Sequence, residues 1–417
     1  MISRVCIKCG TCDKNYTFRI AIGHASIQEH TVICESCGEE ITIRLRLNQS
    51  NGTFDGYEFI NCSQSDNEGK IINLHPEYAL PKEFMHVDFI SPNLLAMRDM
   101  IKDKDKLHTI YKMPDIEKEK LKKLAKATLC INEEWSTVSK IWSLNNRNKN
   151  FHLTNFIEQN RENIFEYKKN ITANEIIFSF LFRCLAPSLE NKLQDAISLI
   201  GAKYRSAPET FRDFCNYHAQ YIFSNNMEKI YSIVRDFFVN YSEYSQNFLE
   251  IKKGSEIKLP YSYSSVNFEK TKKFYGDAYE CLGSCVTTLA CLSNIIKDRK
   301  FDTFNEMDLN KYLTLDKSGK GKCFSDIPEF SWLMLHYVPQ LRNGSHHGTF
   351  KFDSEKKIIS YIPTKKQHVH HIEYFDYLNK CTYMLFSCCI VGAIDIFLYD
   401  KIRYAVMRDS CGIICDI

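Results

Sequence analysis

Two cysteine pairs near the amino terminus constrain the fold of this chain more than any other feature. Cys6 and Cys9 form one Cys-x-x-Cys pair, and Cys34 and Cys37 form a second. On a tight turn, backbone N–H groups can point at thiolate sulfurs, and each pair supplies two soft ligands. Glycine follows both pairs, which suits the turn after the second cysteine. The four thiolates would complete a tetrahedral zinc site, so we expect a structural Zn²⁺ without an open position for catalysis.

The segment between the two pairs reads as two β-strands that lead from one turn to the next. This arrangement resembles a zinc ribbon, so residues 1–60 are expected to form a small β module that the metal folds. The resemblance implies contact with nucleic acid or with a protein partner. Cys12 and His24 are further candidate ligands, although Cys12 would replace Cys9 only with unusual geometry. The expected nucleic-acid contacts are three strand arginines, Arg19, Arg44 and Arg46.

Helical patterns dominate the rest of the chain. Residues 61–110 read as an irregular connector that prolines punctuate. Through residues 111–255, apolar side chains recur at the three- and four-residue spacing of amphipathic helices. A polar break near 252–267 separates them from residues 265–417, where apolar helices flank a predicted hairpin. The expected fold class is therefore mainly α, with one or more helical bundles and a small N-terminal β zinc-ribbon module.

The charge and the apolar segments of the chain limit which partners it could bind and in which cellular compartment it is expected. The formal net charge is only +3, so any site for a polyanion must be local. Five lysines between 118 and 126 favour a solvated helix face, with a phosphate-tracking face as the alternative. The start of the chain has no apolar signal segment, and most cysteines read as buried free thiols, so a cytoplasmic protein is expected. The apolar run Cys381–Tyr399 contains Asp395, which favours a buried bundle helix over a membrane span.

A cationic stretch, Gln340–Phe350, carries the residues that suggest catalysis. Asn343 follows Arg342 directly, and the adjacent His346 and His347 come next. A histidine can exchange a proton with a 2′-hydroxyl or a leaving oxygen near neutral pH. A guanidinium can bind a phosphate through two hydrogen bonds and stabilise charge that develops at phosphorus. These residue types therefore suit metal-independent cleavage of RNA.

The same stretch resembles the motif of the HEPN superfamily, in which an arginine precedes a histidine by a few residues between long helices. The resemblance covers about residues 265–405 and implies a helical bundle with endoribonuclease activity on RNA. It also implies a homodimer that brings two motifs into one cleft, and products with 2′,3′-cyclic phosphate ends. It assigns phosphate binding to Arg342, the acid/base role to His347 and a supporting polar role to Asn343. The family further suggests a toxin or antiviral defence effector with a protein or nucleic-acid trigger.

Helix geometry favours a different histidine from the one that the family spacing selects. On a regular helix Arg342 shares a face with His346, four residues later, whereas His347 lies further round. Pro339 and Gly344 argue against a regular helix at this point. Both histidines therefore remain candidates for the proton-transfer role.

Two other stretches offer competing interpretations. The segment Arg147–His152 repeats the Arg-Asn-x-x-x-His order and would fit a second HEPN-like bundle that pairs within the chain. Its Asn-rich composition is typical of a loop, which favours coincidence. Three more histidines, together with His346 or His347, could bind a transition metal, although a polar strand end beside a phosphate site is favoured. They are His368, His370 and His371.

Two non-enzymatic functions fit the same residues. The ribbon and the bundle could be docking surfaces of a nucleic-acid-binding protein that does not cleave. Alternatively, an inactive bundle could hold two subunits together as a structural partner. The chain contains no GxSxG, HExxH or GxGxxG motif, which removes the common hydrolase, zincin and Rossmann interpretations.

Overall fold

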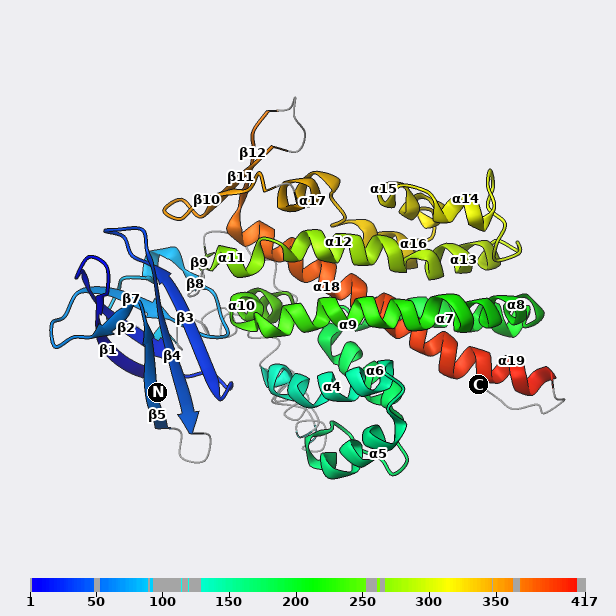
Figure 1. The fold of residues 1–417 in the computed structure, drawn as a ribbon, viewed down its shortest axis with the longest axis horizontal. Coiled ribbons are helices and arrows are strands. Elements are labelled where there is room, and N and C mark those ends of the chain that lie inside the picture. The colour runs from blue at the N-terminus through cyan, green and yellow to red at the C-terminus, as the bar shows by residue number, and fades with distance from the viewer. Residues whose placement is uncertain are drawn as a thin grey trace.

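A small β module at one end of the molecule adjoins an elongated body of helices (Figure 1). This arrangement agrees with the expected fold class, mainly α with a small N-terminal β region. The structure is a computed structural model. It describes residues 2–48, 53–88, 91–92, 114, 119, 129–252, 261–262, 267–346, 348–362 and 368–410.

Two sheets form the β module. The first has the order β6-β1-β2-β7 and consists of β1 (Ile2–Cys9), β2 (Asn15–Ala21), β6 (Cys62–Gln64) and β7 (Lys70–Leu74). The second has the order β3-β4-β5 and consists of β3 (Ile27–Ile33), β4 (Glu40–Asn48) and β5 (Thr53–Ile60). Alternate side chains of a strand point to the same face, so Ile7, Phe18 and Ile43 are buried in one shared core.

The β module continues past the predicted boundary at residue 60. Strand β7 pairs in parallel with β2, and Ile72, Leu74 and Met85 belong to the same core as the earlier strands. The short strand β8 (Leu80–Pro81) pairs with β9 (Tyr261–Ser262), and the 3₁₀ turn η1 (Lys82–Phe84) follows β8. Part of the segment that was expected to be an irregular connector therefore completes the first sheet.

The helical body begins with a series of amphipathic helices. They are α4 (Ile131–Asn146), α5 (Asn150–Gln159), α6 (Ala173–Leu185), α7 (Glu190–Ser206), α8 (Glu209–Tyr217), α9 (Phe223–Val239) and α10 (Tyr241–Lys252). A π-helical segment, η3 (His218–Ile222), joins α8 to α9. The predicted basic face at 118–126 lies, apart from residue 119, outside the described residues.

The second half of the body contains the helices around the cationic stretch. In chain order they are α11 (Phe268–Thr271), α12 (Phe274–Cys285), α13 (Thr287–Ile296), α14 (Leu309–Leu313), α15 (Lys317–Lys320), α16 (Pro328–Ser331), α17 (Pro339–His346), α18 (Tyr374–Phe397) and α19 (Arg403–Ser410). A hairpin of β10 (Lys351–Asp353) and β11 (Ile358–Tyr361) follows α17, as predicted, and β12 (His370–Glu373) adds a third strand. The expected apolar helix before α17 is broken into α16 and the 3₁₀ turn η5 (Trp332–Met334).

Helix α18 is the centre of the helical body. It packs against α6, α7, α9, α10 and α12, and nearly all of its side chains are buried (Figure 1). Buried apolar residues from both sides of the polar break near residue 260 belong to one hydrophobic cluster. The segments that were expected to form a middle domain and a C-terminal bundle therefore share one core.

Two helical segments in the described part of the chain are long and apolar enough to cross a membrane. They are Phe268–Ile296 and Tyr374–Arg408, and 83% and 89% of their most apolar windows are buried inside the molecule. This burial agrees with the interpretation of the run Cys381–Tyr399 as a core helix. Both segments pack as parts of the helical body.

Hydrogen bonds satisfy the one acidic side chain in the middle of that apolar run. The carboxylate of Asp395 is fully buried, and its Oδ1 lies 2.9 Å from Nε2 of His218. Thr288 donates to the same oxygen at 2.7 Å, and Asn226 donates to Oδ2 at 2.9 Å. A buried carboxylate is costly unless it is paired and hydrogen-bonded. These partners come from η3, α9 and α13, so the cluster ties three elements to α18.

Candidate functional sites

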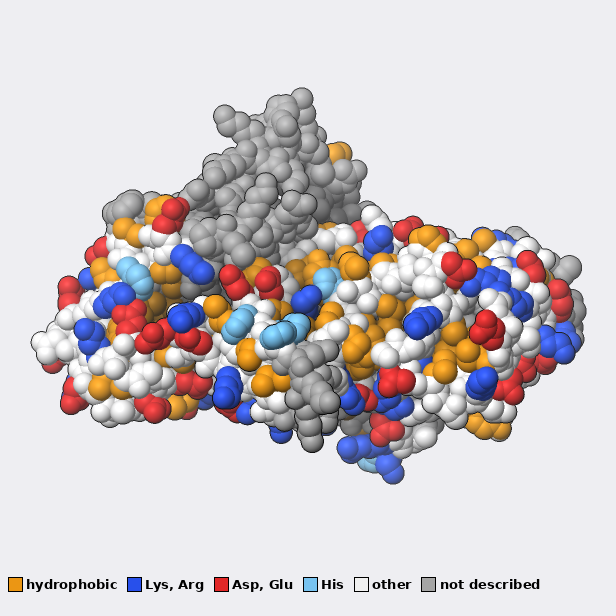
Figure 2. All heavy atoms as spheres, turned by 90° about the horizontal axis from the view of Figure 1, so that it is seen from above, with side chains coloured by type: hydrophobic (Ala, Val, Ile, Leu, Met, Phe, Trp, Pro, Cys, Tyr) orange, Lys and Arg blue, Asp and Glu red, His pale blue; other side chains and the backbone are white. Residues whose placement is uncertain are grey.

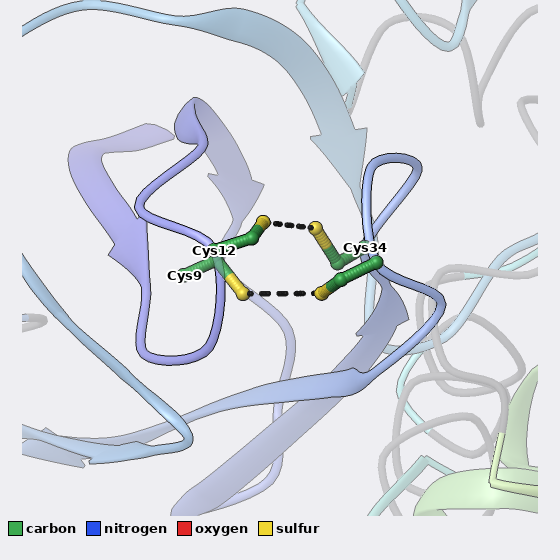
Figure 3. A group of neighbouring side chains, drawn as sticks. Cys9, Cys12 and Cys34 are labelled. Carbon is green, nitrogen blue, oxygen red and sulfur yellow. Dashed lines mark hydrogen bonds between the residues drawn. The ribbon is translucent and has the colours of Figure 1, made fainter.

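Four cysteine side chains from two facing turns lie together in the β module (Figure 3). Cys9 ends β1 and Cys12 lies in the turn that follows, whereas Cys34 and Cys37 belong to the turn between β3 and β4. All four sulfurs lie within 4.8 Å of one another. The Cys9 and Cys37 sulfurs are 3.8 Å apart, and those of Cys12 and Cys34 are 3.6 Å apart. Four thiols in this arrangement are a possible metal-binding site.

The structure corrects the predicted ligand set, because Cys6 lies outside this group and Cys12 takes its place. Cys6 and Cys9 both lie on β1, three residues apart, and neighbouring side chains of a strand point to opposite faces. The Cys6 sulfur lies 3.8 Å from Oγ1 of Thr17 on the neighbouring strand. Cys9 and Cys12 have the same Cys-x-x-Cys spacing as Cys6 and Cys9, so spacing alone could not show which pair supplies the ligands. The strand pattern of residues 2–9 was the signal that could have done so.

A tyrosine supports the cysteine group from β2. The hydroxyl of Tyr16 lies 3.2 Å from the Cys34 sulfur and accepts a hydrogen bond from the backbone N–H of Glu35 at 2.9 Å. Burial by itself would raise the pKa of Cys34. Hydrogen bonds from Tyr16 and from backbone N–H groups in the turn outweigh burial and lower that pKa to about 6. Metals bind the thiolate form, so this environment prepares Cys34 as a ligand.

Three of the other candidate residues of the β module, His24, Arg19 and Arg44, have partners within the protein. Nδ1 of His24 lies 3.0 Å from a carboxylate oxygen of Glu77, so this histidine does not belong to the thiol group. Arg19 is buried and Arg44 is held by two glutamates. Of the three arginines that were expected to contact nucleic acid, only Arg46 is exposed. The strands therefore offer fewer available cations than the sequence suggested.

The first part of the cationic stretch, up to His346, belongs to helix α17, which packs against α12, although Pro339 and Gly344 were expected to disfavour a regular helix. Pro339 occupies its first position, where the missing backbone N–H costs no hydrogen bond. Gly276 of α12 makes the close approach of the two helices feasible. A Cβ atom at that position would lie 2.7 Å from Nε2 of His346, closer than carbon and nitrogen can pack. Arg342, Asn343 and His346 are thus held on one helix against α12.

Arg342 has acceptors on both sides. Its Nε donates to Oε1 of Glu280 at 2.7 Å, and its Nη2 lies 2.7 Å from the same oxygen. Its Nη1 donates to Oδ1 of Asn343 at 3.0 Å. Glu280 also binds the ammonium group of Lys317. One carboxylate therefore holds two cations side by side, and each terminal nitrogen of Arg342 keeps a further N–H donor.

These three side chains remain accessible to a ligand. About a third of each is exposed, with values of 33% for Arg342, 29% for Glu280 and 36% for Lys317. Burial would raise the pKa of Glu280, but the hydrogen bonds and charges of the two cations hold it below its usual value. Glu280 is therefore an anion at neutral pH, and the group of three keeps one net positive charge.

An open groove of about 740 Å³ lies beside this group, between α9 and α12. Glu280, Lys317 and Asp277 line it, together with Lys229 and Arg235 from α9. Burial raises the pKa of Asp277, and the charge of His346 acts in the opposite direction. His346 is exposed at the end of α17, whereas His347 lies outside the described residues. The motif residues on α17 do not line this groove themselves, but Glu280, which binds Arg342, is part of its wall.

The competing motif does not join this site. Arg147 and His152 are exposed at the junction of α4 and α5, and α5 lies on the opposite side of the helical body from α17 (Figure 1). Within one chain, the two Arg-Asn-x-x-x-His stretches do not pair. This placement agrees with coincidence as the interpretation of the first stretch.

The histidines of the strand region do not form a metal group among the described residues. His368, His370 and His371 are all exposed. Nδ1 of His371 lies 2.9 Å from Oγ of Ser360 on the neighbouring strand. On the described part of the face in Figure 2, basic and acidic side chains are interspersed among apolar ones. That mixture fits the small net charge and a local site for a polyanion.

Comparisons of this chain with protein-family models, curated proteins and solved structures give no match. The HEPN and zinc-ribbon resemblances therefore remain predictions. The chemistry of each site is therefore inferred from the side chains that form it. The cysteine turns offer four soft ligands, and α17 offers a guanidinium and an exposed imidazole one helical turn apart.

Proposed function

We propose that this protein is a metal-independent endoribonuclease of the HEPN type. The observation that carries the proposal is the placement of Arg342 and His346 on one short helix, with Glu280 joining Arg342 to the wall of an open groove. Asn343 and Glu280 orient the guanidinium, while Lys317 adds a second cation next to it. A phosphate binder and a proton-transfer group at this separation are what cleavage through the 2′-hydroxyl needs.

In this proposal Arg342 binds the scissile phosphate through the N–H donors that Glu280 and Asn343 leave available. A histidine of the motif accepts the proton of the 2′-hydroxyl, whose oxygen then attacks phosphorus. The 5′-oxygen leaves and takes up a proton, which gives a 2′,3′-cyclic phosphate and a 5′-hydroxyl. A homodimer would bring two copies of the motif to one RNA strand and supply a second histidine as the acid.

The identity of the proton carrier is part of the proposal. His346 lies four residues after Arg342 on regular helix, so both side chains share one face of α17. His347 has the spacing of the HEPN motif and lies outside the described residues. His346→Ala and His347→Ala, each compared with wild type over a range of pH, separate the two. The histidine that transfers the proton is the one whose loss removes a limb of the pH–rate profile.

The direct test uses purified full-length protein and total RNA, with EDTA added just before the RNA. We expect cleavage to persist in EDTA, to leave cyclic phosphate ends and to be lost in Arg342→Ala/His347→Ala. The matched control is Arg147→Ala/His152→Ala, which removes the same residue pair from an exposed place away from the groove. RNA binding without cleavage would instead identify a nucleic-acid-binding protein. A dimer that neither binds nor cleaves RNA would identify a structural subunit.

We further propose that the four grouped cysteines bind a structural Zn²⁺. Four thiolates suit tetrahedral zinc, and one of the two turns that carry them belongs to each sheet, so the metal would link the two sheets. Such a metal would stabilise the fold directly, because the unfolded chain has no preformed site. Metal analysis of Cys12→Ser and Cys6→Ser tests the assignment. We expect bound zinc to be lost in the first variant and retained in the second, and the reverse result would restore the original pairing.

The cellular role follows from the same proposal. An RNA-cleaving enzyme in the cytoplasm would act as a toxin or an antiviral defence effector, under the control of a protein or nucleic-acid trigger. Induced expression of wild type should arrest growth and degrade RNA, whereas Arg342→Ala should do neither. Growth arrest with intact RNA would contradict this role.

A further inference from the structure

Three cysteines of the helical body lie near one another at the groove between α9 and α12, and one of them lines it. Cys281 and Cys285 belong to α12, and Cys388 belongs to α18, which packs against it. The Cys281 and Cys285 sulfurs are 3.9 Å apart. Cys388 is the second thiol that lowers the pKa of Cys281, so one sulfur has two thiol neighbours. This group is separate from the cysteines of the β module.

Cys281 differs from its two neighbours in access and in charge environment. Its side chain lines the groove and is 6% exposed, whereas Cys285 and Cys388 are fully buried. Hydrogen bonds from the two neighbouring thiols, together with the charges of Lys229 and Lys317, hold the pKa of Cys281 below its usual value despite burial. The hydrogen bond to Cys281 and burial raise the pKa of Cys388. One thiol at the groove is thus prepared to react, and a second lies behind it.

We propose that Cys281 is a site of oxidation by hydroperoxides and that Cys388 resolves the oxidised residue into a disulfide between α12 and α18. The proposal does not depend on RNA cleavage. It follows from the grouping of three thiols, the groove that reaches one of them and the two lysines beside it.

The chemistry needs a hydroperoxide as the oxidant. The Cys281 thiolate attacks a peroxide oxygen, the O–O bond breaks, and the sulfur becomes a sulfenic acid while the peroxide is reduced to water. Cys388 then loses its proton and attacks the Cys281 sulfur. The S–S bond forms, and the sulfenic oxygen leaves as a second water. With hydrogen peroxide, two thiols and one peroxide give one disulfide and two waters.

Helix geometry selects Cys388 over Cys285 as the resolving residue. Cβ atoms four residues apart on a helix are separated by about 5–6 Å. A disulfide needs a Cβ separation of about 3.5–4.5 Å, so Cys281 and Cys285 could bond only if α12 were distorted. Cys388 approaches from another helix and is free of this restriction. The expected product therefore joins α12 to α18.

The test is thiol mapping of the full-length protein after brief exposure to hydrogen peroxide. Free thiols are blocked, the protein is digested without reduction, and cross-linked peptides are sequenced by fragmentation. We expect a Cys281–Cys388 disulfide in wild type and a sulfenic acid trapped at Cys281 in Cys388→Ser. Cys281 should be oxidised several-fold faster than Cys291, because the groove reaches Cys281 whereas Cys291 is fully buried.

Cys291 is the matched control, because it is fully buried on α13 and burial raises its pKa. The variant Cys291→Ser should leave the Cys281–Cys388 disulfide unchanged. Oxidation of Cys281 no faster than that of Cys291, or a disulfide between Cys281 and Cys285, would overturn the proposal. If Cys388→Ser does not fold, the wild-type disulfide map still decides between these outcomes.

Discussion

Two stretches of this chain share the order Arg-Asn-x-x-x-His and have opposite surroundings. Arg147 and His152 are exposed where α4 meets α5. Arg342 lies on α17 with Glu280 and Asn343 as hydrogen-bond partners. The spacing is the same in both places, so spacing alone does not distinguish them.

The difference comes from packing between distant parts of the chain. Glu280 precedes Arg342 by 62 residues and reaches it only because α12 and α17 pack together. Gly276 makes that packing close. The stretch at Arg147 has no comparable neighbouring helix with a carboxylate in hydrogen-bond contact among the described residues. A motif becomes a candidate site when the fold orients its side chains.

The largest expected difference between the two stretches is in RNA cleavage. Arg342→Ala should lower the cleavage rate by about 100-fold or more, because removal of one preorganised donor to transition-state charge costs that much in other enzymes. Arg147→Ala should leave the rate unchanged. Initial rates on a labelled RNA measure both variants. Equal losses would show that the surroundings of Arg342 have no special role.

The close packing of α17 predicts the next largest effect, on stability. Gly276→Ala should destabilise the protein by about 1–3 kcal/mol, because the new methyl group collides with α17. Gly201→Ala on α7 is the matched control, since its Cβ would meet only Nη1 of Arg205 at 3.5 Å. That substitution should stabilise the protein by about 0.5–1 kcal/mol through lower backbone entropy. Urea unfolding of both variants checks this pair, and a neutral Gly276→Ala would contradict the packing.

The ion pairs of Glu280 predict a smaller effect that depends on pH. The pKa of this carboxyl is lowered in the folded protein, so its contribution to stability is present above the unfolded-state pKa. The contribution is lost as the pH falls through the folded-state pKa. At neutral pH, Glu280→Gln should cost up to about 1 kcal/mol, because solvent screens a partly exposed pair. Unfolding at neutral and at acid pH measures the change, and a pH-independent difference would rule out the ion pairs as its cause.

The smallest effect is expected at the exposed stretch. Arg147→Gln and His152→Gln should each change the free energy of unfolding by less than about 0.5 kcal/mol, as is usual for surface substitutions. Thermal unfolding of the two variants provides the measurement. A large loss at either position would show that this stretch has a structural role that its exposure does not suggest.

Local pattern was enough to predict several elements correctly. The hairpin of β10 and β11 and the burial of the run around Asp395 both follow from residues that are close in sequence. Periodicity reports such elements because side-chain direction repeats within one helix or strand. The zinc and HEPN assignments stay predictions, because each concerns a bound metal or a reaction.

Other features could not be predicted from the pattern of residues that are close in sequence. The first cysteine pair could be read as Cys6–Cys9 or as Cys9–Cys12, and β1 selects the second by placing Cys6 on the opposite face. The helices before and after the predicted boundary near residue 260 share one hydrophobic core, because α18 packs against helices from both segments.

By itself, the sequence determined that this protein is mainly helical and that it has a cysteine-bearing β module in its N-terminal part. Only the tertiary structure decided that Cys12 joins the thiol group, that Glu280 holds Arg342, and that Cys281 meets Cys388. The physical reason is the distance along the chain over which each kind of interaction acts. Backbone preferences and side-chain periodicity act over a few residues, whereas these contacts join residues that become neighbours only when helices and sheets pack.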